Sequence, residues 1–157
     1  MIFEVHSIQS VEAMDPPARP HAIISIRTPK GPTANLRTGL RTLGVLYVAF
    51  PDVDRNYLDL PEEDKQYVAE DLFGKKNARV ILGFVKKHAP SAELFVVHCE
   101  GGLSRSPGVV AALSKIMNGD DDAWFKRRSG PNMLVYSTLL EVAASEPEWH
   151  GLWKEAP

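Results

Sequence analysis

Short runs of apolar residues, rich in β-branched and aromatic side chains, recur along the chain and predict four β-strands. They cover residues 1–7 (MIFEVHS), 21–27 (HAIISIR), 44–50 (GVLYVAF) and 93–99 (ELFVVHC). The last three runs are almost continuously apolar, which is typical of strands covered on both faces. Helical patterns alternate with these runs, so the chain predicts an α/β fold in which a central, mostly parallel β-sheet is flanked by helices.

Apolar residues that recur at helical spacing predict the helices between and after these strands. A pattern within residues 61–89 predicts a helix that leads into the fourth strand. A second helix is expected to have Pro107 in its first turn, where proline is tolerated, and to stop at Asn118-Gly119. Two further helices are expected around residues 121–128 and 132–145.

The composition matches an ordinary globular protein, with 157 residues of which 44% are hydrophobic and 24% charged. We therefore expect residues 1–157 to form a single domain. The formal net charge of −2 provides no broad basic field, so neither nucleic acid nor an anionic membrane is an expected partner. No apolar run has the length of a membrane span, and the amino terminus lacks the pattern of a signal peptide. A monomer in the cytoplasm is the expectation.

Cys99 is the only cysteine in the chain and lies within VHCEGGLSRSPGVV, residues 97–110. It stands at the predicted carboxyl end of a strand, where ligands bind in α/β folds. The short glycine-bearing loop after it lets successive N–H groups form an anion nest, and the next helix directs its positive amino terminus at the same spot. Arg105 adds a planar donor suited to two phosphoryl oxygens. The loop thus predicts a phosphate cradle around a nucleophilic thiolate.

The stretch HCEGGLSRS, residues 98–106, resembles the signature of the cysteine-dependent protein tyrosine and dual-specificity phosphatases. That signature has His, Cys, five residues, Arg, and then Ser or Thr. Gly102 and Ser104 also stand where the dual-specificity branch commonly has glycine and serine. RSGPNMLVYSTLLE, residues 128–141, resembles the final helix of that branch, which begins with Pro-Asn. The resemblance implies a phosphatase-like domain of the dual-specificity type.

The resemblance also implies a role for each residue of the loop. Cys99 is the expected nucleophile, which forms a phosphocysteine intermediate, and Arg105 is expected to bind phosphate. Ser106 is expected to stabilise the departing thiolate, and His98 to shape the loop. The backbone amides expected to cradle the substrate phosphate belong to Glu100, Gly101, Gly102, Leu103, Ser104 and Arg105.

A leaving alkoxide or phenoxide needs a proton, so the reaction requires a general acid. Phe50-Pro51-Asp52 resembles the Trp-Pro-Asp loop of the tyrosine phosphatases and follows a predicted strand. Asp52 is therefore the expected general acid and base, and Asp54 is the alternative acid. Because Pro-Asp is also ordinary turn chemistry, a purely structural Asp52 stays open.

The expected substrate is a phosphorylated protein, with phosphotyrosine favoured and phosphoserine or phosphothreonine also considered. Glu100 at the rim would repel polyanions, which argues against phosphoinositides and RNA triphosphates. No metal and no other cofactor is expected, because the nest, the helix terminus and Arg105 supply a positive field. The alternatives are a weak or inactive phosphate-binding module, or a phosphatase of a non-protein phosphate ester. Asp120, Asp121 and Asp122 are expected to cap a helix rather than bind a metal.

Overall fold

Four parallel strands form one sheet in the computed structural model, which describes residues 1–54, 61 and 72–155. The strands stand in the order β1-β4-β2-β3, and every neighbouring pair is parallel. Their bounds are Ile2–Ser7 for β1, His21–Arg27 for β2, Thr42–Ala49 for β3 and Leu94–Cys99 for β4. The predicted fold class is confirmed, and the predicted strands are present with small shifts at their ends.

Burial separates the central strands from β3 at the edge of the sheet. Every residue of β4 is buried, and so is every residue of β2 except Arg27. In β3, by contrast, Leu43 and Tyr47 are exposed. The expectation that both faces of this strand are covered was wrong, because β3 has a neighbour on one side only, and the helices that follow β1 and β4 pack against those two strands while the helix that precedes β4 packs against β3.

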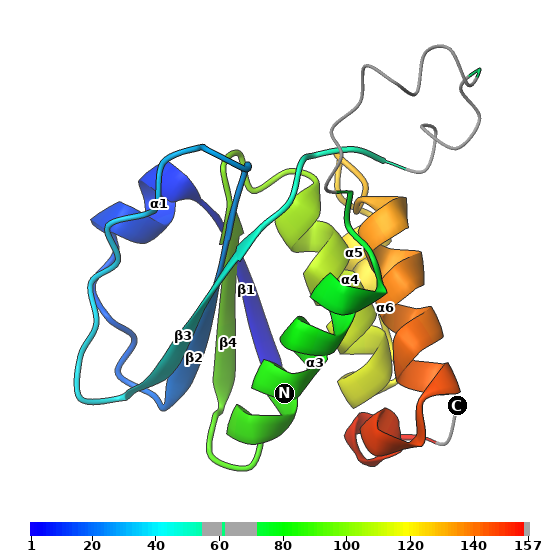
Figure 1. The fold of residues 1–157 in the computed structure, drawn as a ribbon. Coiled ribbons are helices and arrows are strands. Elements are labelled where there is room, and N and C mark those ends of the chain that lie inside the picture. Colours follow the sequence, from blue (N-terminus) through cyan, green and yellow to red (C-terminus); the bar gives the residue numbers. More distant parts are fainter. Residues whose placement is uncertain (55–60, 62–71, 156–157) are drawn as a thin grey trace.

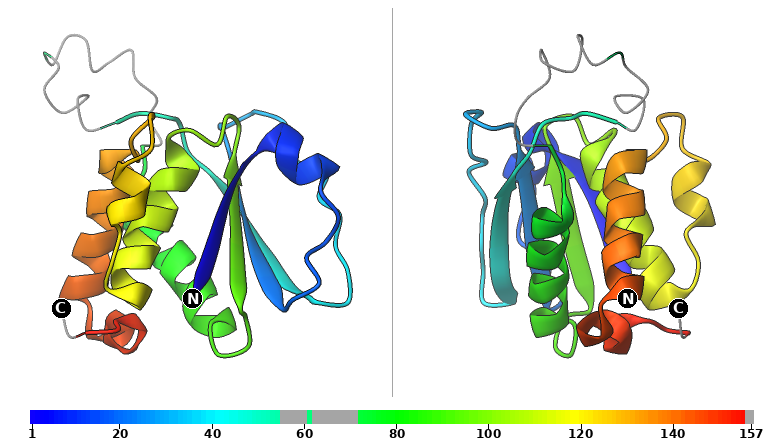
Figure 2. Two further views of the ribbon diagram at one scale, coloured as in Figure 1. Left: turned by 180° about the vertical axis from the view of Figure 1, so that it is seen from behind. Right: turned by 45° about the vertical axis from the view of Figure 1, so that its right-hand side comes forward.

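One face of the sheet carries most of the helices, as Figures 1 and 2 show. The main hydrophobic core lies between this helical layer and the sheet and includes Phe95, Val97 and Leu113. The layer consists of α3 (Lys75–His88), α4 (Arg105–Asn118), α5 (Asp122–Phe125), α6 (Met133–Ser145) and a 3-10 helix (Pro147–Leu152). None of the helices in the described ranges combines the length and apolar character needed to cross a lipid bilayer.

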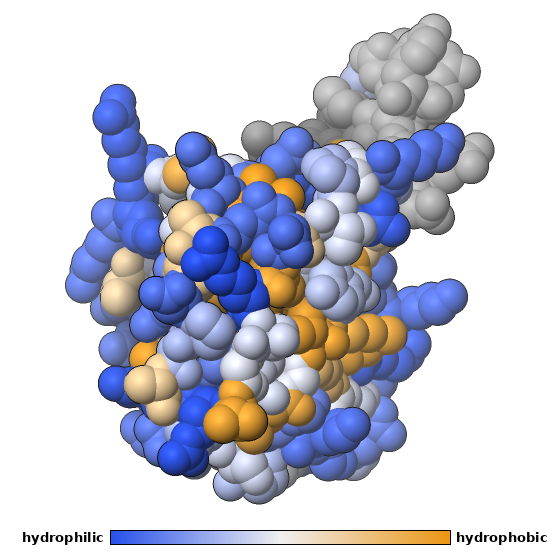
Figure 3. All heavy atoms as spheres, turned by 90° about the vertical axis from the view of Figure 1, so that its left-hand side faces the viewer, coloured by the Kyte–Doolittle hydropathy of each residue, from blue (hydrophilic) through white to orange (hydrophobic). Residues whose placement is uncertain are grey.

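The opposite face of the sheet carries α1 (Ile8–Ala13) and part of the connection between β2 and β3. A smaller hydrophobic cluster lies beneath them and includes Val11, Ile23 and Val96. Figure 3 looks onto this side of the molecule, which is mainly hydrophilic with apolar side chains gathered near its middle. α1 begins at an N-cap in which Ser7 Oγ accepts a hydrogen bond from the N–H of Ser10 at 3.1 Å.

The predicted long helices agree with α3, α4 and α6, and α4 ends as expected at Gly119, whose φ of 76° is left-handed. The segment 121–128 is helical only over Asp122–Phe125. α1 and the 3-10 helix were not predicted, because six residues are too few to show a helical period. Residues 62–71 of the predicted helical segment lie outside the described part of the chain.

Candidate active site

The loop between β4 and α4 places the Cys99 sulfur among hydrogen-bond donors. Cys99 is the last residue of β4 and is only 2% exposed. Its Sγ accepts hydrogen bonds from the N–H of Gly102 at 3.2 Å and from Oγ of Ser106 at 3.1 Å. Ser106 lies in the first turn of α4, so the helix amino terminus faces the same sulfur. These donors stabilise negative charge at Sγ.

Gly102 can occupy its position because it has no side chain. Its φ is +68°, which L-residues with a side chain rarely adopt. A Cβ added there would lie 2.8 Å from the carbonyl carbon of His6 and 2.8 Å from the nitrogen of Ser7. The loop backbone therefore packs directly on the end of β1, and this contact turns the Gly102 N–H toward the sulfur.

Arg105, the first residue of α4, is buried beneath the loop and held by several acceptors. Its Nη1 donates to Oγ1 of Thr28 at 3.1 Å and to the carbonyl oxygen of Phe50 at 3.0 Å. Its Nη2 donates to a carboxylate oxygen of Glu100 at 3.3 Å. The Thr28 hydroxyl in turn donates to the same Glu100 oxygen at 3.1 Å, so Thr28 and Glu100 lie together along the Nη1–Nη2 edge.

These contacts leave two N–H groups of the Arg105 guanidinium without a hydrogen-bond partner among the described residues. A guanidinium has five N–H donors, and the contacts above use both on Nη1 and one on Nη2. Nε is buried and donates to no partner among the described residues. Nε–H and the second Nη2–H point along one edge, which has the geometry for two oxygens of a phosphate. Oδ2 of Asp52 lies 4.0 Å from Nε.

His98 lies under the loop on the opposite face of β4 from Cys99. Its Nε2 is 2.7 Å from Oγ of Ser25, and its Nδ1 is 3.4 Å from the carbonyl oxygen of Cys99. Because a carbonyl can only accept, Nδ1 carries the proton and Nε2 accepts from Ser25. Burial lowers the pKa of His98 below its ordinary value, which favours the neutral ring. His98 thus tethers the end of β4 to β2.

The structure separates the two candidate acids that follow β3. Asp52 Oδ1 accepts hydrogen bonds from Oγ of Ser104 at 2.7 Å and from Nδ2 of Asn132 at 3.1 Å. Its side chain is 45% exposed, so the carboxylate borders both the loop and solvent. Asp54 Oδ1 instead accepts from the N–H groups of Met133 and Leu134 at 2.8 and 3.3 Å. Asp52 therefore faces the loop after Cys99, whereas Asp54 caps the first turn of α6.

Asn132 ties together three segments of the site. It is fully buried, and its Nδ2 donates to Asp52 and, at 3.1 Å, to the carbonyl oxygen of Val53. Its Oδ1 accepts from the N–H of Val135 at 3.1 Å and so caps α6. Its own N–H donates to the carbonyl oxygen of Ser104 at 3.0 Å. Asn132 positions the residues around Asp52 relative to the loop and to α6.

Sequence reasoning assigned no role to Asn132, Thr28 or Ser25, although each contacts an expected site residue. The Pro-Asn that opens the last helix was a signal for Asn132. Thr28 directly follows β2, and polar residues at the carboxyl ends of parallel strands meet at one edge of the sheet. Ser25 pairs in register with His98, but that pairing becomes visible only when the strand order is known.

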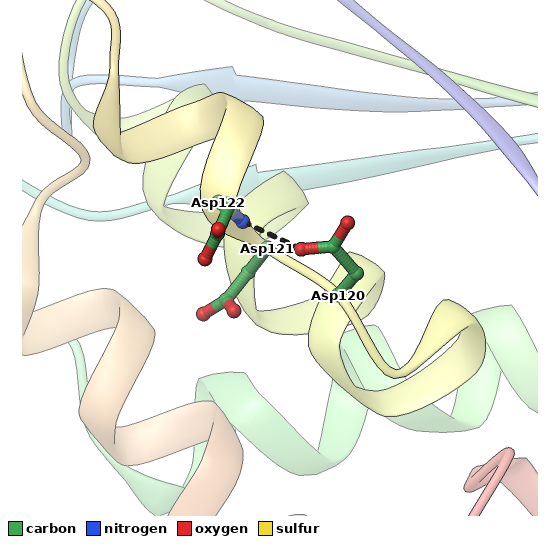
Figure 4. Close-up of side chains that lie close together, drawn as sticks. All are labelled: Asp120, Asp121 and Asp122. Atoms are coloured by element: carbon green, nitrogen blue, oxygen red, sulfur yellow. Dashed lines mark hydrogen bonds between the residues drawn. The ribbon is translucent and has the colours of Figure 1, made fainter.

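Asp120, Asp121 and Asp122 lie beyond the other end of α4 (Figure 4). Side chains of histidine, cysteine, aspartate and glutamate can bind metal ions. Among the described residues, these three aspartates are the one group of three or more such side chains whose possible metal-binding atoms all lie within 4.8 Å of one another. Asp120 Oδ1 accepts from the N–H of Asp122 at 3.0 Å at the start of α5, whereas the N-cap residue Asp121 makes no capping hydrogen bond through its side chain, so the expected capping role is found for Asp120 alone. Asp121 accepts from the hydroxyl of Tyr136 at 2.5 Å and pairs with Lys115 at 3.6 Å. These contacts hold the carboxylates of Asp120 and Asp121 in place.

Comparison with solved structures shows a similarity of fold. No protein-family model matches the sequence, and no curated protein matches it. In structure, the chain is similar to the crystal structure of Tk-PTP, a tyrosine phosphatase, in the active form, with a TM-score of 0.50 and 18% sequence identity. The likeness covers 88% of this chain and 90% of that one. At this identity the likeness bears on the fold alone, and the chain has a tyrosine-phosphatase-like fold.

Proposed function

We propose that the protein is a cysteine-dependent phosphatase that hydrolyses phosphate monoesters. The observation that carries this proposal is the Cys99 sulfur, which accepts from the Gly102 N–H and the Ser106 hydroxyl in the loop that leads into the buried Arg105. A nucleophile and a two-pronged phosphate donor at one helix amino terminus suit an in-line phosphoryl transfer. The tyrosine-phosphatase-like fold is consistent with this chemistry.

In the first step, the Cys99 thiolate attacks phosphorus, an S–P bond forms and the ester P–O bond breaks. The Nε–Nη2 edge of Arg105 binds two phosphoryl oxygens and stabilises the charge that builds up in the transition state. Asp52 gives a proton to the leaving oxygen, and its position beside Ser104 supports this role. Asp54 serves the first turn of α6 instead.

In the second step, water attacks phosphorus and the S–P bond breaks. The Asp52 carboxylate takes a proton from that water, and inorganic phosphate leaves. The Gly102 N–H and the Ser106 hydroxyl stabilise the returning thiolate, since both already donate to Sγ. Arg105, the loop amides and the helix terminus provide the positive field, so the mechanism uses no metal ion or other cofactor.

The favoured substrate is phosphotyrosine in a protein, with phosphoserine and phosphothreonine as further substrates. Leu103 in the loop is 61% exposed and offers an apolar contact for an aromatic leaving group. A phosphate ester on a small molecule is the alternative substrate.

Hydrolysis of para-nitrophenyl phosphate in the presence of a chelator tests this function. We expect turnover by the natural protein, loss of about a thousandfold or more in Cys99→Ser, and a much larger loss in Asp52→Ala than in Asp54→Ala. Nitrophenol leaves readily, so an ester with a poorer leaving group enlarges the Asp52 effect. No turnover by the natural protein would refute the proposal, and phosphate binding without turnover would identify an inactive phosphate-binding module.

A further inference from the structure

The carboxylate of Glu100 is held in place at the entrance of the loop. One of its oxygens accepts both from the Thr28 hydroxyl at 3.1 Å and from Nη2 of Arg105 at 3.3 Å. Its backbone is fixed as well, because the carbonyl oxygen of Glu100 accepts from the N–H of Ile8 at 3.1 Å. Two side chains thus hold the negative charge of Glu100 in position, and a backbone N–H from a third segment holds its main chain.

Glu100 and Arg105 differ in how much of each side chain is exposed to an approaching substrate. The Arg105 side chain is 3% exposed, whereas the Glu100 side chain is 63% exposed. Phosphate held on the Nε–Nη2 edge of Arg105 leaves the rest of the substrate to extend toward solvent past the loop of residues 100–104. The side chain of Leu103, also exposed on this loop, is apolar and does not offset the charge of Glu100.

From this arrangement we infer that Glu100 is a specificity-determining residue, which selects phosphate esters with basic or neutral surroundings and rejects those with a second anionic group beside the ester. This role rests on the proposed phosphatase function and narrows it to a substrate class: phosphotyrosine in peptide segments flanked by lysine or arginine. A fixed carboxylate attracts cations and repels anions near it, and such charges act more on partner choice than on bare affinity. Glu100 also offsets part of the charge of Arg105, which lowers the affinity of the site for free phosphate.

Two phosphotyrosine peptides that differ only in having lysine or aspartate on each side of the phosphotyrosine test this inference. The natural protein should give the higher kcat/KM with the lysine peptide, and Glu100→Gln should lower the ratio of the two values by about three- to tenfold, as expected for one partly screened charge. Thr28→Val, which keeps the charge but removes the hydroxyl that holds it, should lower the ratio by less. Glu93→Gln removes the same charge at the opposite end of β4 and should leave the ratio unchanged.

A binding measurement separates this inference from the proposed function. Dissociation constants of the two peptides are measured with Cys99→Ser and with the Cys99→Ser, Glu100→Gln double variant, so that no turnover is needed. The double variant should bind the aspartate peptide more tightly and lose the preference for lysine. An unchanged preference in Glu100→Gln, with hydrolysis intact, would overturn the role of Glu100 and leave the phosphatase standing. Failure of the natural protein to bind or hydrolyse either peptide would overturn the role of Glu100 in peptide selection, and only loss of para-nitrophenyl phosphate hydrolysis as well would overturn the phosphatase function.

Discussion

The two ends of α4 carry similar residue types in different settings. At the amino end, the buried Arg105 lies 4.0 Å from Asp52, and its Nε has no hydrogen-bond partner among the described residues. At the carboxyl end, Lys115 lies 3.6 Å from Asp121, which also accepts from Tyr136. The Lys115 side chain is 44% exposed, so water solvates the part of its charge that the ion pair with Asp121 does not neutralise.

This difference shows why only one end of the helix is suited to chemistry. An unpartnered buried donor is costly, and an anionic ligand that accepts from it removes that cost. The amino end adds free N–H groups and a partial positive charge, whereas the carboxyl end presents carbonyl groups. A cation beside a carboxylate is therefore a candidate binding site at the amino end and a structural contact at the carboxyl end.

The largest effect expected at the amino end comes from Arg105→Lys. A lysine keeps the charge but has no two-pronged edge, and it cannot make all three contacts to Thr28, Phe50 and Glu100. We expect kcat for para-nitrophenyl phosphate to fall by about a hundred- to a thousandfold, as for loss of a preorganised transition-state donor. Arg79→Lys, at an exposed ion pair with Glu146, is the matched control and should retain activity. Equal activity of Arg105→Lys and the natural protein would contradict the assigned role.

A smaller effect on activity is expected for Asn132→Ala. The change removes the hydrogen bonds to Asp52 and Val53 and the cap of α6, so kcat should fall by about tenfold and the free energy of unfolding by about 1–3 kcal/mol. Both quantities follow from steady-state kinetics and urea denaturation.

Asn118→Ala is the control for Asn132 at the other end of α4. Asn118 accepts from the amino-terminal ammonium group at 3.0 Å and donates to the carbonyl oxygen of Met1 at 2.9 Å. Its loss should lower stability and leave kcat unchanged. If both asparagine variants reduced kcat in proportion to their loss of stability, Asn132 would have no positioning role.

The smallest effect is expected for Tyr136→Phe in α6, whose hydroxyl donates to Asp121, just after the carboxyl end of α4. Loss of the hydrogen bond to Asp121 should lower the free energy of unfolding by about 1 kcal/mol and leave kcat within about twofold. Burial, with the hydrogen bond to Asp121, raises the pKa of Tyr136 well above its ordinary value. The folded state therefore holds the phenol proton more tightly, and stability should fall as pH rises above about 10, the pKa of an unfolded tyrosine.

Urea denaturation of the natural protein and Tyr136→Phe at several alkaline pH values measures this contribution. The difference in the free energy of unfolding between the two proteins should shrink as the pH rises above about 10, the pKa of an unfolded tyrosine. A difference that stayed constant across that range would show that the hydroxyl is not protected in the folded state.

The α/β architecture could be predicted from the sequence because short segments identify most of its strands and helices. The apolar runs ending at Arg27 and Cys99 are long enough to identify strands, and Asn118-Gly119 is a strong helix stop. α1 was not predicted because six residues are too few to show a helical pattern of apolar positions, and its start depends on the N-cap by Ser7. The exposure of β3 depends on strand order, which no short segment encodes.

At the candidate site, the sequence identified the loop and two candidate acids, but not which acid borders the loop or that Thr28 and Asn132 contact the site. Asp52 and Asp54 differ by two positions, and only the three-dimensional structure places one beside Ser104 and the other at the start of α6. The contact between Thr28 and Arg105 joins residues 77 positions apart. Such contacts arise where the carboxyl ends of the parallel strands converge, so they depend on the whole topology rather than on a motif.

The most direct test of the central claim is detection of the phosphocysteine intermediate. The natural protein is mixed with a phosphotyrosine peptide and quenched in acid during turnover, and its proteolytic fragments are analysed by mass spectrometry. The proposed mechanism predicts one added phosphoryl group on the fragment that contains Cys99, and none on the corresponding fragment of Cys99→Ser. Turnover without this modification, or with the phosphoryl group on another residue, would contradict it.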